Sequence, residues 1–240
     1  MRVLPKDKGT GSDRRIFLRQ VILNFHGIGV PDQPLEPGEA PYWVTEDFFK
    51  EVLARAEYYK TRVHTAFTFD DGNQSDLEIG AQWLARHNRT ATFFVLADRI
   101  GQRGSLDVAG IRALVDAGHS IGSHGAAHID WKMADAATLE HELGQDTRNT
   151  IADAATHPIT SAAIPFGRYN ATVLRALSRH GYARVYSSDG GSWRPGQNPI
   201  PRTSLRHNMT MADIENLLIK RMPAGKRLRQ GVSRTIKKTF

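Results

Sequence analysis

The sequence predicts an α/β fold in which parallel strands alternate with helices. Short runs rich in β-branched and aromatic residues recur along the chain, and between them lie segments whose apolar residues follow the helical period. This alternation is typical of a parallel sheet covered by helices. The 240 residues are enough for one domain with a full hydrophobic core, and as a single α/β barrel the chain need not divide in two.

Composition and turn residues delimit each expected element. Strands are expected at 21–25, 66–69, 91–96, 120–122, 162–164 and 183–186. Helices are expected at 46–59, 76–87, 106–117, 134–151, 171–180 and 211–221. Thr45 and Ser105 precede two of these helices as N-cap residues, and Gly118 and Gly181 follow two others. The proline-rich segment 29–41 and the glycine- and proline-rich segment 190–201 are expected to be loops, the first bordering the functional site.

The net charge of +7 is concentrated at the C-terminus. Eight of the 32 Lys and Arg residues lie in 219–240, which contains no acid, so the other 24 nearly balance the 25 Asp and Glu residues. We therefore divide the chain into an N-terminal extension (1–19), a main domain (20–218) and a basic tail (219–240). The tail could contact an anionic membrane surface or a polyanionic glycan, where each basic side chain contributes about 1 kcal/mol, or it could be a solvated terminus.

The sequence lacks cysteine and long apolar runs, and each absence excludes some classes of protein. Without cysteine, the chain forms no disulfide, no thiolate metal site and no cysteine nucleophile. No apolar run reaches the length of about eighteen residues that a membrane span needs, and the N-terminus is charged rather than apolar, unlike a signal peptide. A cytoplasmic protein is therefore expected, with the tail as a candidate contact with the inner face of the membrane, and no nucleic-acid partner is expected.

The segment Thr68-Phe69-Asp70-Asp71-Gly72 ends an apolar strand with two adjacent carboxylates. Neighbouring residues of a strand point to opposite faces, but a turn at the strand end can bring both carboxylates into one site. Two close carboxylates repel each other and raise the pKa of one of them, a cost that a bound cation removes. A metal site is the natural interpretation, and the alternative is an Asp-Gly turn with solvated acids.

The segment Ser123-His124-Gly125-Ala126-Ala127-His128 follows another expected strand. Histidines at i and i+4 can face the same side of one helical turn, about 5–6 Å apart at Cβ, which suits a shared metal. Imidazole together with carboxylate suits zinc and similar ions. A pair of histidines is often incidental, so the interpretation depends on this pair coinciding with the Asp70-Asp71 turn at another strand end.

Further candidates follow other strands, because α/β barrels gather their catalytic residues at the carboxyl ends of the strands. Pro165-Phe166-Gly167 exposes backbone at a third strand end. Trp193 and Phe166 could give a sugar an apolar wall, or they could belong to the core. His26 ends the first strand and could reach the site, although a histidine there is more often structural.

Together these segments resemble the polysaccharide deacetylases, carbohydrate esterase family 4 with its NodB homology domain. Residues 68–72, 124–128 and 165–167 look like the first three family motifs, and their order and spacing cover roughly residues 20–210. The resemblance implies a distorted, incomplete (β/α) barrel that hydrolyses linear amide bonds, with 20–218 as the catalytic domain. It also implies that Asp71, His124 and His128 hold one divalent metal ion, with zinc as the expected ion. Asp70 would be the general base, and the backbone N–H of Phe166 would face the oxyanion.

The sequence departs from the family pattern at three places. Ala163 stands where the third motif would begin with an arginine that orients the base, and Arg202 and Arg206 are the candidate replacements. Ser192 replaces the acid beside the tryptophan of the fourth motif, which leaves Asp189 and Trp193. His207 stands where the fifth motif supplies the catalytic acid, within atypical surroundings. Sugar contacts are expected from Pro165, Trp193, Asp189, Arg202, Arg206 and His26.

The expected reaction is removal of an N-acetyl or similar acyl group from an amino sugar, with Asp70 as base and His207 as acid. The substrate would be an amino-sugar polysaccharide or a lipid-linked oligosaccharide; the basic tail favours a membrane-proximal precursor in exopolysaccharide synthesis. Two histidines and one carboxylate also form the facial triad of non-haem Fe(II) oxygenases, although those usually have a double-stranded β fold. A third hypothesis, motivated by Ala163 and Ser192, is a non-catalytic glycan-binding homologue.

Overall fold

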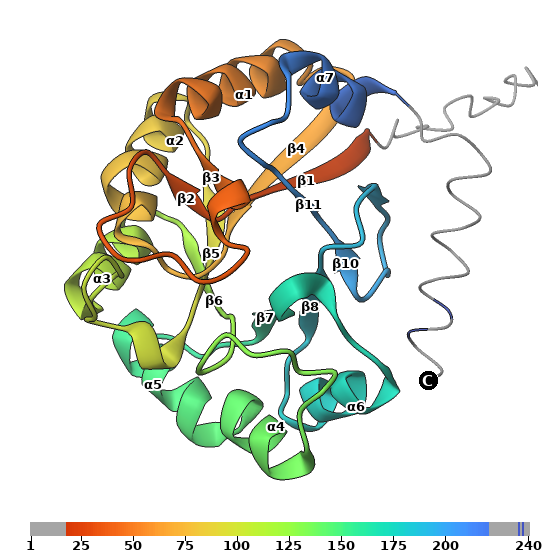
Figure 1. The fold of residues 1–240 in the computed structure, drawn as a ribbon. Helices are drawn as coiled ribbons and strands as arrows, with labels where there is room; N and C mark the ends of the chain where they lie inside the picture. The colour runs from red at the N-terminus through yellow and green to blue at the C-terminus, as the bar shows by residue number, and fades with distance from the viewer. Residues whose placement is uncertain (1–17, 221–234, 236, 238–240) are drawn as a thin grey trace, which may run out of the picture.

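The computed structural model describes residues 18–220, 235 and 237. Its main sheet has the strand order β10-β8-β7-β6-β5-β4-β1-β11, and the helices surround this sheet on the outside (Figure 1). Neighbouring strands along this order are parallel, as predicted, and only the short strand β9 pairs with β1 in the antiparallel direction within the described residues. The sheet curls into a nearly closed barrel, so the predicted distorted, incomplete (β/α) barrel is confirmed.

The body of the sheet consists of the strands predicted from the sequence. They are β1 (Arg19–Phe25), β4 (Val63–Phe69), β5 (Ala91–Val95), β6 (Ser120–Ser123), β7 (Ser161–Ala163) and β8 (Arg184–Ser187). The short strands are β2 (Gly27–Ile28), β3 (Trp43–Val44), β9 (Ser192–Trp193), β10 (Ile200–Pro201) and β11 (Thr203–Ser204). The segment 190–201, predicted to be a loop, therefore contains β9 and β10, whereas 29–41 is a loop that leads into a 3-10 turn (Ala40–Tyr42).

The barrel closes through the segment 200–204. β10 pairs with β8 at one end of the strand order, and β11 pairs with β1 at the other end. Because only Arg202 separates β10 from β11 in the sequence, this short segment spans the gap between the two edges of the sheet. The side chain of Arg202 is 0% exposed. Barrel closure thus places an arginine in the protein interior.

Most helices match the prediction, and two are interrupted. The helices are α1 (Glu46–Tyr58), α2 (Gln82–Arg86), α3 (Val108–Asp116), α4 (Ala136–Leu143), α5 (Gln145–Ala155), α6 (Ala171–Arg179) and α7 (Met211–Ile219). The helix predicted at 76–87 begins with a π-helix (Asp76–Ala81) before α2, and the extended backbone of Gly144 divides 134–151 into α4 and α5. Thr45 caps α1 as predicted, but Asp107 caps α3 instead of Ser105.

Aromatic side chains beneath the carboxyl ends of β1, β4 and β5 support the site. Phe25, Phe69 and Phe93 are fully buried; the ring centroids of Phe69 and Phe93 lie 4.6 Å apart. Each buried ring contributes about 1.5–3 kcal/mol to folding. Because Phe25 pairs with Phe69 in the register of β1 and β4, the residues that follow them, His26 and Asp70, leave the sheet side by side.

The residues that the structure describes form the barrel and its helices, from β1 to α7. The predicted division into extension, domain and tail stays a prediction, since residues 1–17 and most of 221–240, with the predicted helix end at Arg221, lie outside the described residues. Among the described residues, no helix combines the length and the apolar character that crossing a membrane requires.

Candidate active site

Asp71, His124 and His128 converge at the carboxyl edge of the barrel. Oδ1 of Asp71 lies 3.5 Å from Nε2 of His124 and 3.5 Å from Nε2 of His128. One ligand atom from each residue lies within 4.8 Å of the others. The 3.5 Å spacing is close to the ~3.4 Å expected between the ligands of a tetrahedral zinc ion with bonds of about 2.1 Å. We refer to these three residues as the metal triad.

The unsatisfied carboxylate of Asp71 fits a cation. Both of its oxygen atoms are buried and have no hydrogen-bond partner among the described residues. A buried carboxylate without a partner is costly, and a cation shared with two imidazole nitrogen atoms would remove that cost. One carboxylate oxygen with two imidazole nitrogens is also a donor set that zinc prefers. The residues present therefore fit a divalent metal ion.

The two histidines meet through a loop, so the predicted helical turn is wrong. Residues 124–130 contain no helix, and Gly125 and His128 have φ values of 95° and 54°. The imidazole ring centroids nevertheless lie 5.3 Å apart. Asp71 (φ 77°) and Phe166 (φ 56°) also have positive φ. Such backbone strain in non-glycine residues is concentrated at functional sites, which agrees with this position.

Glu142, in α4, holds the loop that carries the histidines. Its carboxylate accepts hydrogen bonds of 3.0 Å from the backbone N–H groups of Ala126 and Ala127 and from Nε1 of Trp131. Hydrogen bonds to charged groups contribute about 1.5–3 kcal/mol each. Glu142 is only 1% exposed. No motif marks this residue in the sequence, where it is one of several acids in a predicted helix.

Hydrogen bonds at Nδ1 leave Nε2 of both histidines free for a ligand role. Nδ1 of His124 lies 2.9 Å from the carbonyl oxygen of Ala163, and Nδ1 of His128 lies 2.9 Å from Oε2 of Glu36. In each pair Nδ1–H donates, which fixes the tautomer and the ring orientation. Burial lowers the pKa of His124 to about 4, so its imidazole is neutral at neutral pH. Through Glu36, the proline-rich loop borders the site as predicted.

Glu36→Gln is expected to weaken metal binding about 10–100-fold, the usual effect of removing a carboxylate behind a metal-binding histidine. Glu36 is also paired with Arg99, which anchors its carboxylate. A Zn²⁺ titration of the metal-free protein measures the affinity, and Asp32→Asn, at an exposed acid of the same loop, is the matched control. Equal affinities of Glu36→Gln and wild type would show that His128 does not depend on this partner.

Asp70 is fixed by Arg202 in the interior of the barrel. Nη1 of Arg202 donates to Oδ1 of Asp70 at 2.6 Å and Nη2 donates to Oδ2 at 2.8 Å, while Nδ2 of Asn24 donates to Oδ2 at 2.9 Å. Burial favours a raised pKa, but the charge and hydrogen bonds of Arg202, together with the nearby histidines, outweigh burial and hold the pKa of Asp70 well below its usual range. Asp70 is therefore an oriented carboxylate, 4.0 Å from Nε2 of His124.

Ala163 leaves room for this arginine. The guanidinium of Arg202 lies over the rings of Phe94 and Tyr186, at 5.1 and 5.8 Å from their centroids. Ala163 packs in one cluster with the same two rings. The arginine that contacts Asp70 is thus supplied by the segment 200–204, which closes the barrel, and not by the end of β7, where Ala163 lies. Of the two predicted replacements, Arg202 makes this contact.

His26, Tyr42 and Arg206 lie on another side of Asp70. Nε2 of His26 is 4.0 Å from Oδ2 of Asp70, and its ring centroid is 4.7 Å from that of Tyr42. Arg206 donates to the Tyr42 hydroxyl at 2.8 Å, and its guanidinium lies 4.8 Å from the ring centroid. The structure therefore places His26 beside Asp70, and among the described residues Arg206 is linked to His26 through Tyr42.

The third motif lies against the metal triad. The ring of Phe166 is 55% exposed, and its centroid is 4.6 Å from that of His128. Pro165 is buried, and Gly167 has a φ of 62°. This turn keeps the Phe166 peptide close to the triad. The assignment of its N–H to an oxyanion stays a prediction.

Two predicted site residues are not brought to this group. His207 is exposed and its backbone N–H donates to the carbonyl of Pro41, but within residues 18–220 its ring has no hydrogen bond or ion pair to Asp70 or to the triad. Trp193 pairs with Gln20, near the beginning of β1, whereas the site lies at the other end of that strand. The partly buried Trp193 packs against a core cluster that includes Ile22. Their catalytic and sugar-binding roles stay predictions.

Asp76 is a buried acid beside the site that no motif indicates. It is 0% exposed, and its two carboxylate oxygens have no hydrogen-bond partner among the described residues. Burial, together with the negative charges of Asp71 and Asp70, raises the pKa of Asp76 well above its usual value. Burial and the neighbouring carboxylates therefore favour the protonated form of Asp76.

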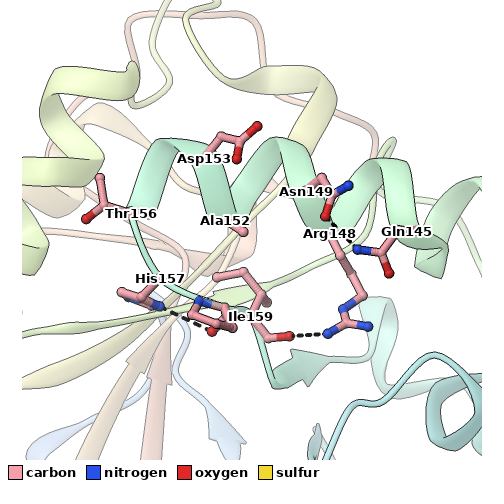
Figure 2. Close-up of a pocket in the computed structure, with 9 residues that line it drawn as sticks. Gln145, Arg148, Asn149, Ala152, Asp153, Thr156, His157 and Ile159 are labelled. Atoms are coloured by element: carbon pink, nitrogen blue, oxygen red, sulfur yellow. Dashed lines mark hydrogen bonds between the residues drawn. The ribbon is translucent and has the colours of Figure 1, made fainter.

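A separate surface cavity of about 560 Å³ is lined by residues of α5 and of the segment that follows it (Figure 2), and none of them belongs to the metal triad. Arg148, one of its lining residues, donates to the carbonyl of Ile159 at 3.0 Å, and Gln145 pairs with Asn149. Nδ1 of His157 lies 3.2 Å from the carbonyl oxygen of Pro158. None of the lining residues is a predicted site residue. The carboxyl edge of the barrel therefore remains the candidate active site.

Comparison with solved structures agrees with this fold. The deacetylase PplD of Streptococcus pyogenes, solved in complex with acetate, superposes with a TM-score of 0.70 at 20% identity, over 84% of this chain and 98% of that chain. IcaB from Ammonifex degensii gives a TM-score of 0.66 at 16% identity, over 83% of this chain and 95% of that chain. At these identities the likeness establishes the fold alone.

Sequence comparisons add the family. The putative polysaccharide deacetylase YxkH of Bacillus subtilis is 24% identical over 67% of this chain and 53% of its own length. The peptidoglycan-N-acetylglucosamine deacetylase PgdA of Listeria monocytogenes is 30% identical over 49% of this chain. The matched region is only 24% of the length of that relative. The family model described as polysaccharide deacetylase matches residues 59–185, more than half of the chain and including the Asp70-Asp71 turn, both histidines of the triad and the third motif. On these grounds the chain belongs to the polysaccharide deacetylase family.

Proposed function

We propose that this protein is a metal-dependent hydrolase that removes N-acetyl groups from the amino sugars of a polysaccharide or its lipid-linked precursor. The observation that carries the proposal is the unpartnered carboxylate of Asp71, which faces two free Nε2 atoms with the charged Asp70 alongside. Family membership supports the reaction class, since the chain's relatives include proteins named as deacetylases.

Asp71, His124 and His128 would hold the ion, with zinc as the proposed metal. A divalent ion at such a site polarises the acyl carbonyl and lowers the pKa of water. The chain itself supplies the base: Asp70, kept charged and oriented by Arg202, accepts the proton of the water molecule that attacks the acyl carbon. The Phe166 N–H donates to the developing oxyanion.

A general acid must protonate the departing nitrogen as the C–N bond breaks. Two histidines are proposed candidates. His207 matches the position in the family's motif, but His26 lies closer, with Nε2 4.0 Å from Asp70. A comparison of His26→Ala with His207→Ala identifies the acid, because only the variant that lacks the true acid loses the basic limb of the pH–rate profile.

An acetate-release assay tests the proposal. The substrates are a panel of N-acetylated glycans that includes peptidoglycan and a lipid-linked oligosaccharide, each with chelator and with added Zn²⁺. Release of acetate that chelator abolishes and zinc restores is expected. Glycan binding without acetate release would support the non-catalytic hypothesis instead, and oxygen consumption would support the oxygenase.

We also propose that the basic tail contacts an anionic membrane and so brings the protein close to a lipid-linked substrate. Most of the tail lies outside the described residues, so the proposal rests on its charge. Binding to vesicles with and without anionic lipid, measured at two salt concentrations, tests it.

A further inference from the structure

The carboxylate of Asp189 is the centre of a small polar cluster at the end of β8. Its Oδ2 accepts hydrogen bonds from the Tyr169 hydroxyl at 2.7 Å and from Oγ of Ser187 at 2.9 Å. Nζ of Lys237 donates to Oδ1 at 2.8 Å and to the carbonyl oxygen of Gly167 at 3.1 Å. The same Nζ lies 4.8 Å from the centroid of the Tyr169 ring. Asp189, Tyr169 and the Gly167 carbonyl form what we call the Asp189 cluster.

These partners match the chemistry of a primary ammonium group. An ammonium carries three donors and a full charge, and it is recognised by a carboxylate, by a carbonyl oxygen and by an aromatic face. The Asp189 cluster presents one of each to Nζ of Lys237. The side chain of Asp189 is only 10% exposed, so its charge is largely shielded from water. Lys237, which occupies this position, lies 48 residues after Asp189 in the sequence.

The cluster lies beside the candidate active site. β7 and β8 are parallel neighbours, so the residues that follow them lie at the same edge of the barrel. Gly167 is adjacent to Phe166, whose ring contacts His128. On the other side of Asp189, the N–H of Gly190 donates to the backbone carbonyl of Arg202 at 2.9 Å. The cluster is thus joined by short backbone connections to the residues that flank Asp70 and the triad.

We propose that the Asp189 cluster is a subsite for a primary ammonium group, filled here by Lys237 and available to the free amino group of a glucosamine unit when Lys237 withdraws. The substrate class rests on the proposed function, because de-N-acetylation of an amino sugar produces such amino groups. Lys237 thereby competes with partly deacetylated glycan. Lys237 therefore limits the binding of glycan that already carries amino groups.

Direct binding to the full-length, zinc-loaded protein tests the subsite without relying on catalysis. The probe is a glucosamine tetramer, and cellotetraose, which has hydroxyl groups in place of the amino groups, is the uncharged control. In Lys237→Ala, the affinity for the glucosamine tetramer is expected to rise about tenfold or more, because the occluded state is removed. Lys220→Ala, which removes the same charge at an exposed position, is the matched control and should leave the affinity unchanged.

Adding Asp189→Asn to Lys237→Ala should reduce glucosamine-tetramer binding to the level of cellotetraose. Equal affinities of wild type and Lys237→Ala would overturn the proposal and make the Lys237 contact a structural one. Binding that persists in the double variant would also overturn it. If the binding pattern appears but no glycan releases acetate, the ammonium subsite stands and the proposed hydrolase function fails. If a glycan releases acetate but the binding pattern is absent, the hydrolase function stands and the ammonium subsite fails.

Discussion

Arg202→Ala is expected to lower acetate release about 10²–10⁴-fold, the range for loss of a functional general base. The variant leaves Asp70 buried without its bidentate partner, 2.6 and 2.8 Å away in the wild type. Removing one member of a buried ion pair typically costs about 3–5 kcal/mol, so the free energy of unfolding should fall as well. Acetate release under saturating Zn²⁺ and urea denaturation measure the two effects.

A second substitution separates orientation of the base from simple loss of stability. Ala163→Arg placed in the Arg202→Ala background puts an arginine at the family's usual position, in the space that the Arg202 guanidinium vacates beside Phe94 and Tyr186. Partial recovery of activity is expected. Arg112→Ala, which removes an exposed arginine of α3, is the control and should retain the activity. Wild-type activity in Arg202→Ala would refute the assignment of Arg202 as the positioning residue for Asp70.

Asp70→Asn is expected to bind metal as the wild type does and to lose acetate release about 10²–10⁴-fold. The change preserves the shape of the side chain but removes its capacity to take a proton, and Asp70 is outside the metal triad. His124→Ala is expected to lose both properties, because it removes one of three ligands. Zinc titration and acetate release, measured on the same preparations, distinguish the two patterns.

The contrast between these variants is the informative result. Because Asn at position 70 leaves the buried Arg202 without its charged partner, the free energy of unfolding should fall, and thermal denaturation checks that the variant is folded at the assay temperature. Equal activity of Asp70→Asn and wild type would refute the base assignment. Full metal binding in His124→Ala would remove that histidine from the metal triad.

The features predicted from sequence are those that depend on neighbours in the chain. Alternating apolar runs locate the strands, since burial of residues such as Phe25 and Phe69 follows directly from strand composition. The rule that parallel strands end at one edge then brings Asp71, His124 and His128 together. Even within this set, the local backbone was beyond prediction, because a loop with positive φ and a helical turn can present the same two histidines.

Contacts between distant segments required the structure. Arg202 and Asp70 are 132 residues apart, and their pairing depends on how the segment 200–204 closes the barrel. Glu36 meets His128 across 92 residues, from a loop whose prolines indicate only that it is irregular. The composition of a strand does not determine whether it pairs in the parallel or the antiparallel direction. The antiparallel pairing of β9 with β1 places Trp193 beside Gln20, near the beginning of β1.

The central claim is that one divalent ion binds at the metal triad. Elemental analysis of the purified protein after dialysis against limiting Zn²⁺ measures this directly, with Asp71→Asn as the comparison. We predict one equivalent of zinc per chain in the wild type and a large loss in Asp71→Asn. A wild-type chain that retains no divalent metal, or an Asp71→Asn variant that retains a full equivalent, would contradict the account.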